Sequence, residues 1–148
     1  MQSEYVQTTV EPVVKLIALD VLIVDENLND LKYYAEIFEA EGLRVVRRDS
    51  YKMAIYSILR GRTFDLAVVD QGSAAFEGRA VLRCLRPFTP VLVLTRDYHI
   101  ECYRQAMELG AAEYLEKPVS PEQIHRALRE CLGIPVHLRK GRQSGDAA

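Results

Sequence analysis

The chain has 148 residues, of which 49% are hydrophobic and 27% charged, a size and balance that fit one globular domain and exclude a disordered or fibrous chain. Its net charge of −2 and isoelectric point of about 5.9 do not supply the broad basic surface that direct nucleic-acid binding requires. The start MQSEY lacks the positive region of a secretory signal and the longest apolar stretch is broken by charges, so we expect a cytoplasmic protein without a membrane span.

From Val21 onward, short apolar runs alternate with longer amphipathic stretches, which is typical of a parallel sheet covered by helices on both faces. We predict strands at residues 21–24, 43–46, 65–69, 91–95 and 113–116. The first, third and fourth runs are apolar on both faces and are expected in the centre of the sheet. The second run, LRVVRR, carries charge and fits a sheet edge better.

Helical spacing of apolar residues predicts a first helix that begins at residue 28 and ends before residue 42. Ser50 is a good N-cap for a second helix, which we expect to end at Gly61. A third, short helix is predicted over residues 78–85.

The fourth predicted helix is capped by Asp97 and ends at Gly110. The last helix is the clearest, because its apolar residues form one stripe while Ser120 supplies an N-cap and Pro121 the first turn. Five strand-helix units therefore make up the predicted domain.

Two flanking segments lie outside this repeat. Residues 1–15 are expected to be an N-terminal arm, although the sequence leaves an extra strand or a mobile segment open. Residues 16–133 make up the predicted domain, and residues 134–148 a polar tail or linker without periodicity. The three cysteines are widely spaced and form no CxxC pair, so we expect them to stay reduced.

Reactive side chains follow four of the predicted strands. Asp25 and Glu26 end the first strand, Asp70 the third and Thr95 the fourth, while Lys117 directly follows the fifth. Ligands of open parallel sheets bind beyond the carboxyl ends of the strands. These five side chains are therefore expected to meet at one edge.

Three carboxylates at one site raise one another's pKa and destabilise the fold unless a cation compensates them. Carboxylate oxygens, a backbone carbonyl and retained waters are the ligands that Mg²⁺ takes. Asp25, Glu26 and Asp70 therefore predict a magnesium site. Lys117 is placed to bind a phosphoryl or carboxylate oxygen, and Thr95 can offer a hydroxyl hydrogen bond.

The motifs LIVDEN, DLAVVD, VLVLT and YLEKP, in this order, resemble those of the receiver domain of bacterial two-component response regulators over roughly residues 16–133. The resemblance implies a flavodoxin-like receiver fold, an α/β doubly wound parallel sheet with strand order 2-1-3-4-5. It implies that Asp70 is the phosphoacceptor. It also implies that Asp25, Glu26 through water, and the carbonyl of Gly72 complete the Mg²⁺ site.

By the same resemblance, Asp70 receives its phosphoryl group from a sensor histidine kinase, a phosphotransfer protein or a small acyl phosphate. An aspartate is already ionised at neutral pH, so the nucleophile needs no general base. The protein is then a signalling phosphoacceptor that catalyses only its own phosphorylation and dephosphorylation, rather than an enzyme acting on other substrates.

The resemblance further implies a switch formed by Thr95 and Tyr114. Phosphorylation would change the surface of the fourth helix, fifth strand and fifth helix, which addresses a downstream effector or output domain. Whether the chain forms a homodimer through these helices is left open by the sequence.

Two departures from the family pattern stand out. Ala74 occupies the position where a proline is common, so we expect a more mobile loop and modestly weaker metal binding. Arg96 stands where a small residue is usual, and it could screen Asp70 or pair with Glu26 or the phosphoryl group. We expect Arg96 to alter phosphorylation or dephosphorylation rates without abolishing either reaction.

Two other functions share parts of this set of residues. Haloacid-dehalogenase-like phosphatases would use Asp25 as nucleophile, but they require an acid two positions later, where this chain has Asn27, and a cap for which it lacks length. A phosphorylation-independent interaction module is opposed by the complete set of charged site residues, but Arg96 keeps that alternative open.

Overall fold

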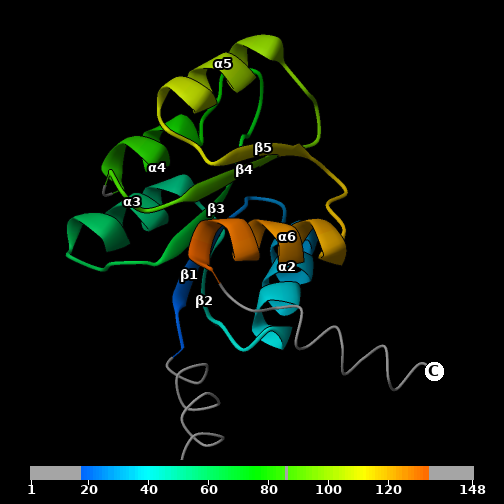
Figure 1. Cartoon of the computed structure of the whole chain (residues 1–148). Coiled ribbons are helices and arrows are strands. Elements are labelled where there is room, and N and C mark those ends of the chain that lie inside the picture. The colour runs from blue at the N-terminus through cyan, green and yellow to red at the C-terminus, as the bar shows by residue number, and fades with distance from the viewer. Residues whose placement is uncertain (1–17, 86, 134–148) are drawn as a thin grey trace, which may run out of the picture.

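The computed structural model describes residues 18–85 and 87–133, so the predicted arm at 1–15 and tail at 134–148 lie outside the described residues. One parallel sheet contains β1 (Asp20–Val24), β2 (Arg44–Arg48), β3 (Leu66–Asp70), β4 (Val91–Thr95) and β5 (Glu113–Glu116). The helices are α2 (Leu28–Ala40), α3 (Tyr51–Leu59), α4 (Arg79–Cys84), α5 (Ile100–Glu108) and α6 (Pro121–Leu132). The order β2-β1-β3-β4-β5 confirms the predicted doubly wound topology and its three central strands (Figure 1).

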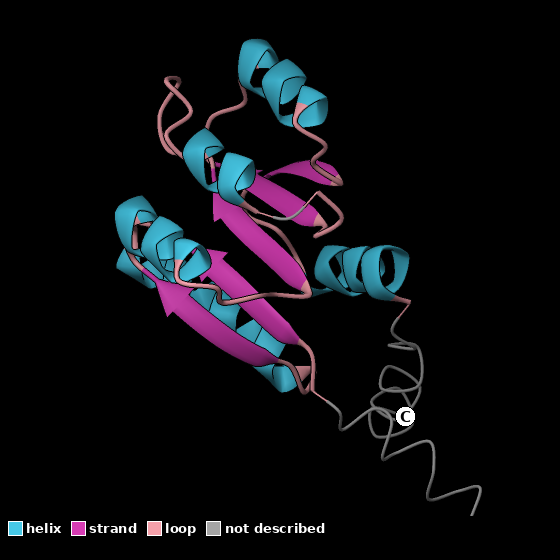
Figure 2. Ribbon diagram, turned by 90° about the vertical axis from the view of Figure 1, so that its left-hand side faces the viewer, coloured by secondary structure: helices cyan, strands magenta, loops and turns pink. Residues whose placement is uncertain are grey.

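The helices form two layers, one on each face of the sheet. Helices α2 and α6 share one apolar core with alternate residues of β1, whereas α3, α4 and α5 share a second core with the residues between them (Figures 1 and 2). Val21 and Ile23 point to the first core and Leu22 and Val24 to the second, each at most 2% exposed. Full burial of such a side chain contributes about 1.5–3 kcal/mol, which explains why the four residues of β1 that follow Asp20 are all apolar.

Several strand bounds and one helix cap differ from the predictions; the third strand, for example, spans Leu66–Asp70 rather than 65–69. The second strand begins at Arg44 rather than 43 and continues to Arg48, because it pairs residue for residue with β1. Asp97 does not cap α5; the N-cap is His99, whose side chain makes no capping hydrogen bond. The Asp97 main chain instead bonds with the hydroxyl of Thr95, which fixes the loop before the helix.

The other helix starts agree with the sequence. The Ser50 hydroxyl accepts a hydrogen bond from the Met53 amide, and Ser120 forms a capping box with Gln123 at the start of α6. These caps satisfy amides that a helix leaves without an internal partner, so they fix where α3 and α6 begin.

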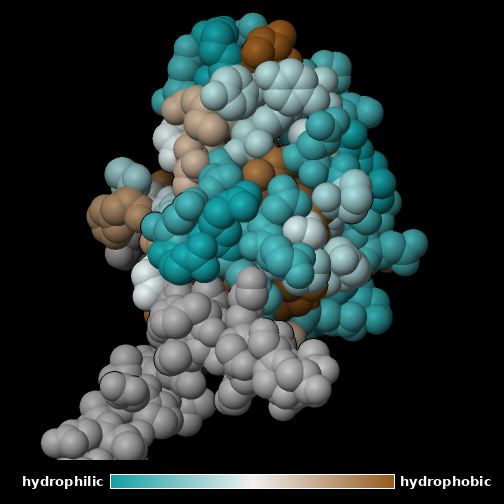
Figure 3. All heavy atoms as spheres, turned by 45° about the vertical axis from the view of Figure 1, so that its right-hand side comes forward, coloured by the Kyte–Doolittle hydropathy of each residue, from teal (hydrophilic) through white to brown (hydrophobic). Residues whose placement is uncertain are grey.

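The surface drawn in Figure 3 is mainly hydrophilic, with hydrophobic residues scattered over it in small groups. No helix in the described part of the chain combines the length and apolar character needed to cross a membrane. All three cysteines are free, as expected.

Candidate functional site

The carboxyl edge of the sheet brings an ammonium group between two aspartates. Lys117 Nζ lies 2.7 Å from Asp25 Oδ2 and 2.7 Å from Asp70 Oδ1. The side chains of Lys117 and Asp25 are 4% exposed and that of Asp70 is 15% exposed. A cavity of about 400 Å³ opens beside these groups and is also lined by Glu26 and Gly72. Four of the five predicted site residues thus surround one polar cavity.

Main-chain and hydroxyl groups hold the two aspartates in place. The Asn27 amide donates to Asp25 Oδ1 over 2.9 Å, and the Gly72 amide donates to Asp70 Oδ2 over 2.9 Å. The Tyr51 hydroxyl donates to the carbonyl of Asp70 over 3.0 Å. Each carboxylate therefore keeps one oxygen on a main-chain donor and turns the other toward Lys117.

The loop that follows Asp70 is closed by a serine and a glutamate. The Ser73 amide donates to Glu77 Oε1 over 2.7 Å, and this bond lowers the pKa of Glu77. Gly72 has φ of 88°, and a Cβ added there would lie 2.4 Å from Glu77 Oε1. The loop thus has fixed contacts even though Ala74 replaces the usual proline.

The balance of charge in the site is visible in its pKa shifts. Burial raises the pKa of Asp25, with a further rise from Asp70, against the lowering effect of Lys117. Burial by itself would lower the pKa of Lys117, but hydrogen bonds to Asp25, Asp70 and Asp30 raise it above its ordinary value. Lys117 is therefore protonated at neutral pH, yet it does not fully offset the cost of a buried, ionised Asp25.

The donor set fits a magnesium ion that keeps several waters. The carboxylates of Asp25, Glu26 and Asp70 and the main chain of Gly72 line one cavity and offer only oxygen ligands. In residues 18–85 and 87–133, no three acidic, histidine or cysteine side chains converge closely enough to hold a metal by themselves. Burial and the neighbouring Asp70 raise the pKa of Asp25, so its ionised form is costly here and an added cation is favourable.

The predicted switch residues lie beside the aspartates without touching Asp70. The hydroxyl of Thr95, which is 1% exposed, donates to the carbonyl of Asp97 over 2.7 Å. The Tyr114 hydroxyl donates to the side-chain oxygen of Gln71 and accepts from the His99 amide over 3.3 Å. Thr95 can therefore reach a phosphoryl group only after its bond to Asp97 breaks.

Arg96 does not pair with Glu26, as one interpretation of the sequence expected. Its Nη2 lies 2.6 Å from Asp30 Oδ2, while the same oxygen accepts from Lys117 Nζ over 2.9 Å. Asp30 was missed from the sequence because an acid in the first turn of a helix is ordinarily explained by the helix dipole. The arginine nevertheless lines the cavity, as its position after β4 suggested.

Two further residues were also missed. Nothing in the sequence singled out Tyr51, and the completely buried Gln71 stood only as part of the loop that follows Asp70. No spacing rule links either residue to the site, since both act through hydrogen bonds that only the packed structure forms.

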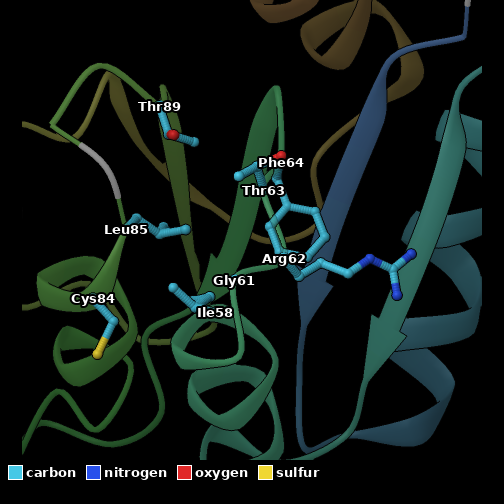
Figure 4. A pocket seen from close by; sticks show the side chains of 8 residues that line it. All are labelled: Ile58, Gly61, Arg62, Thr63, Phe64, Cys84, Leu85 and Thr89. Atoms are coloured by element: carbon cyan, nitrogen blue, oxygen red, sulfur yellow. The ribbon is translucent and has the colours of Figure 1, made fainter.

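A second, smaller cavity of about 140 Å³ lies at the opposite edge of the sheet (Figure 4). It is enclosed by the ends of α3 and α4 and by the residues before β3 and β4. The lining residues are Ile58, Gly61, Arg62, Thr63, Phe64, Cys84, Leu85 and Thr89, and they include no carboxylate. This cavity therefore lacks the groups for metal or phosphoryl chemistry.

Comparison with known proteins gives a consistent result. The family model described as the response regulator receiver domain matches residues 21–129. The transcriptional regulatory protein ZraR of Escherichia coli is 28% identical over 117 residues, which cover 77% of this chain and 26% of ZraR. AlgB, an alginate biosynthesis transcriptional regulatory protein of Pseudomonas putida, is 31% identical, again over 77% of this chain and 26% of AlgB.

Solved structures agree with the sequence matches. A CheY-like receiver domain protein of Methanospirillum hungatei superimposes with a TM-score of 0.70 at 27% identity, covering 76% of this chain and 92% of that one. The BeF3-activated receiver domain of DrrB, from Thermotoga maritima, gives a TM-score of 0.68 at 25% identity, covering 79% and 99%. The chain spans about a quarter of the length of the curated relatives it matches.

Proposed function

The chain belongs to the response regulator receiver domain family of two-component systems, and on that premise we propose that Asp70 is its phosphoacceptor. The observation that carries the proposal is the placement of the Asp70 carboxylate 2.7 Å from the buried ammonium of Lys117, beside a cavity lined with oxygen ligands. A carboxylate in this setting can act as the nucleophile, and the adjacent ammonium can neutralise the negative charge of the incoming phosphoryl group.

In the proposed reaction, an Asp70 oxygen attacks the phosphorus of a phosphohistidine on a sensor kinase or phosphotransfer protein, or of a small acyl phosphate. A new phosphorus–oxygen bond forms, and the bond from phosphorus to the leaving imidazole nitrogen or carboxylate oxygen breaks, its electron pair departing with that group. The product is an aspartyl phosphate. The Gly72 amide and Tyr51 hydroxyl hold the residue in position while this occurs.

Mg²⁺ held by Asp25, Asp70 and the main chain of Gly72, with Glu26 acting through water, would supply charge neutralisation for the transferred phosphoryl oxygens. Lys117 would bind one of those oxygens through its ammonium group.

The signal would leave the site through Thr95. Its hydroxyl would exchange the Asp97 carbonyl for a phosphoryl oxygen, and Tyr114 would respond behind it. The surface so altered is formed by α5, β5 and α6 and addresses an effector or output domain rather than nucleic acid. We propose that the chain exchanges phosphoryl groups with its kinase in the cytoplasm.

This proposal is favoured over a phosphorylation-independent module because the chain keeps Asp25 and Asp70 both in contact with Lys117. The test is a heteronuclear NMR titration with Mg²⁺ and beryllofluoride, a phosphoryl mimic. Resonance changes at Thr95 and Tyr114 and along α5, β5 and α6 are expected. Unchanged spectra at saturating concentrations of both reagents would contradict the proposal.

A further inference from the structure

One carboxylate outside the predicted set joins the three segments that frame the cavity. Asp30 lies in the first turn of α2, where its amide donates to the Asn27 side chain over 3.0 Å. Its Oδ2 accepts from Lys117, which follows β5, and from Arg96, which follows β4. Asp30 therefore links α2 to the ends of both strands.

The ammonium of Lys117 is fully engaged by this arrangement. A lysine has three N–H donors, and three carboxylates lie within hydrogen-bonding distance of Lys117 Nζ: Asp25 at 2.7 Å, Asp70 at 2.7 Å and Asp30 at 2.9 Å. A phosphoryl oxygen can bind Lys117 only if one of these acceptors gives way. Asp70 is the nucleophile, so the choice falls between Asp25 and Asp30.

Asp30 is the acceptor that can release Lys117 at the lower cost. The Asp25 side chain is 4% exposed, and Lys117 is the one cationic side chain that pairs with it among the described residues, so loss of the lysine would leave this buried carboxylate dependent on Mg²⁺ alone. The Asp30 side chain is 15% exposed and retains the guanidinium of Arg96, whose Nη2 contacts both carboxylate oxygens at 2.7 and 2.6 Å. Asp30 thus has a second cation when the first departs.

Through its contact with Arg96, Asp30 also affects the entrance of the cavity. The Arg96 side chain is 61% exposed and lines the cavity, and exposed pairs of this kind contribute little to stability. Its contact with Asp30 therefore matters mainly for where the guanidinium lies.

We propose that Asp30 is a positioning residue for phosphoryl capture: it retains Lys117 and Arg96 in the resting site and releases Lys117 to the incoming phosphoryl oxygens. This inference rests on the proposed function of Asp70. If it is right, Asp30 affects the binding of the two ligands of the site in opposite directions. The negative charge of Asp30 favours Mg²⁺ and, by competing for Lys117, opposes the phosphoryl anion.

The test uses Asp30→Asn, with binding of Mg²⁺ alone and of beryllofluoride at saturating Mg²⁺ measured by isothermal titration calorimetry. Removing the negative charge of Asp30 is expected to weaken Mg²⁺ binding about 3- to 10-fold and to tighten beryllofluoride binding by a similar factor. The matched control is Glu36→Gln on the same helix, which makes the same charge change at an exposed carboxylate paired with Lys32. It should leave both constants unchanged.

If Asp30 had a purely structural role, Asp30→Asn would weaken the binding of both ligands together. If Asp30 had no role, both dissociation constants would stay at the parent values. Either result overturns the inference. Should Asp30→Asn fail to fold by circular dichroism, Asp30→Ser, which also removes the charge, repeats the measurement. Failure of the proposed function is distinguishable, because the parent protein itself would then fail to bind beryllofluoride.

Discussion

The hydroxyl of Tyr114 on β5 donates a hydrogen bond to the side-chain oxygen of Gln71, the residue directly after Asp70. Gln71 is completely buried, and its amide nitrogen donates to the carbonyl of Ser73 over 3.2 Å. One side chain therefore connects the loop beyond the proposed phosphoacceptor with the proposed switch tyrosine.

Tyr114→Phe should destabilise the protein by about 1–3 kcal/mol, because it leaves the buried Gln71 oxygen without a donor. In urea unfolding, the double variant Tyr114→Phe with Gln71→Leu should lose about 1 kcal/mol less free energy of unfolding than the two single variants lose together. Each substitution removes the same hydrogen bond, so its loss counts only once in the double variant. Tyr103→Phe, on a neighbouring exposed ring, is the control and should change stability by less than about 0.5 kcal/mol. Strict additivity would show that the two groups are not coupled.

A second tyrosine supports the segment that carries Lys117. The buried Val119 amide donates to the hydroxyl of Tyr34 on α2 over 3.0 Å. Tyr34→Phe removes the acceptor and should cost about 1–3 kcal/mol in the free energy of unfolding. Tyr33→Phe, on the adjacent and 48% exposed ring, should have no measurable effect. Equal stabilities of the two variants in chemical denaturation would refute a supporting role for this bond.

Gly78 allows the start of α4 to approach the acceptor strand. A Cβ at this position would lie 2.3 Å from the carbonyl oxygen of Asp70, so the backbone must shift. Gly78→Ala should therefore destabilise the fold and slow phosphorylation by acetyl phosphate, measured by intact mass against time.

The control is Gly61→Ala, where an added Cβ meets nothing within 4 Å but φ is +97°. It should lose about 1 kcal/mol of stability from backbone strain while keeping the parent phosphorylation rate. A parent-like rate in Gly78→Ala would mean that the close approach has no role at the site.

Burial makes the ionised Asp25 costly when no metal is bound. The pKa of Asp25 is raised in the folded state. Without metal, the contribution of this carboxyl group to the free energy of unfolding is therefore fully present below about pH 3.8 and is lost as the pH rises through the folded pKa. Asp25→Asn should consequently be more stable than the parent at pH 7 without Mg²⁺, and this advantage should disappear in acid. Thermal unfolding at several pH values measures the difference.

Mg²⁺ should reverse that order. At ten times its dissociation constant it should stabilise the parent by about 1.4 kcal/mol and leave Asp25→Asn unchanged. Because the ion requires the ionised carboxylate, its affinity for the parent should fall as pH drops through the raised pKa. An equal magnesium-induced rise in melting temperature for both proteins would place the ion elsewhere.

The fold could be predicted because its strands and caps are local signals. Apolar runs such as residues 21–24 and 91–95 are strands buried on both faces, and a serine before a helix satisfies orphan amides whatever lies around it. Asp97 failed as a cap because α5 begins only at Ile100, with His99 at the N-cap, after a loop that the Thr95 hydroxyl fixes through the Asp97 main chain.

The site could be predicted only where strand ends determine position. Asp25, Asp70 and Lys117 follow three strands of one parallel sheet, so topology alone brings them together. Asp30 and Gln71 could not be foreseen, because their roles come from side-chain directions and packing between distant elements.

The central claim is that Asp70 receives the phosphoryl group. The most direct measurement incubates the protein with acetyl phosphate and Mg²⁺, traps the acyl phosphate by borohydride reduction and locates the modified residue by peptide mass spectrometry. We predict one magnesium-dependent phosphoryl group per chain, mapped to Asp70 and lost in Asp70→Asn. A modification that maps to another residue, or a protein that stays unmodified while a known receiver domain is labelled under the same conditions, would contradict it.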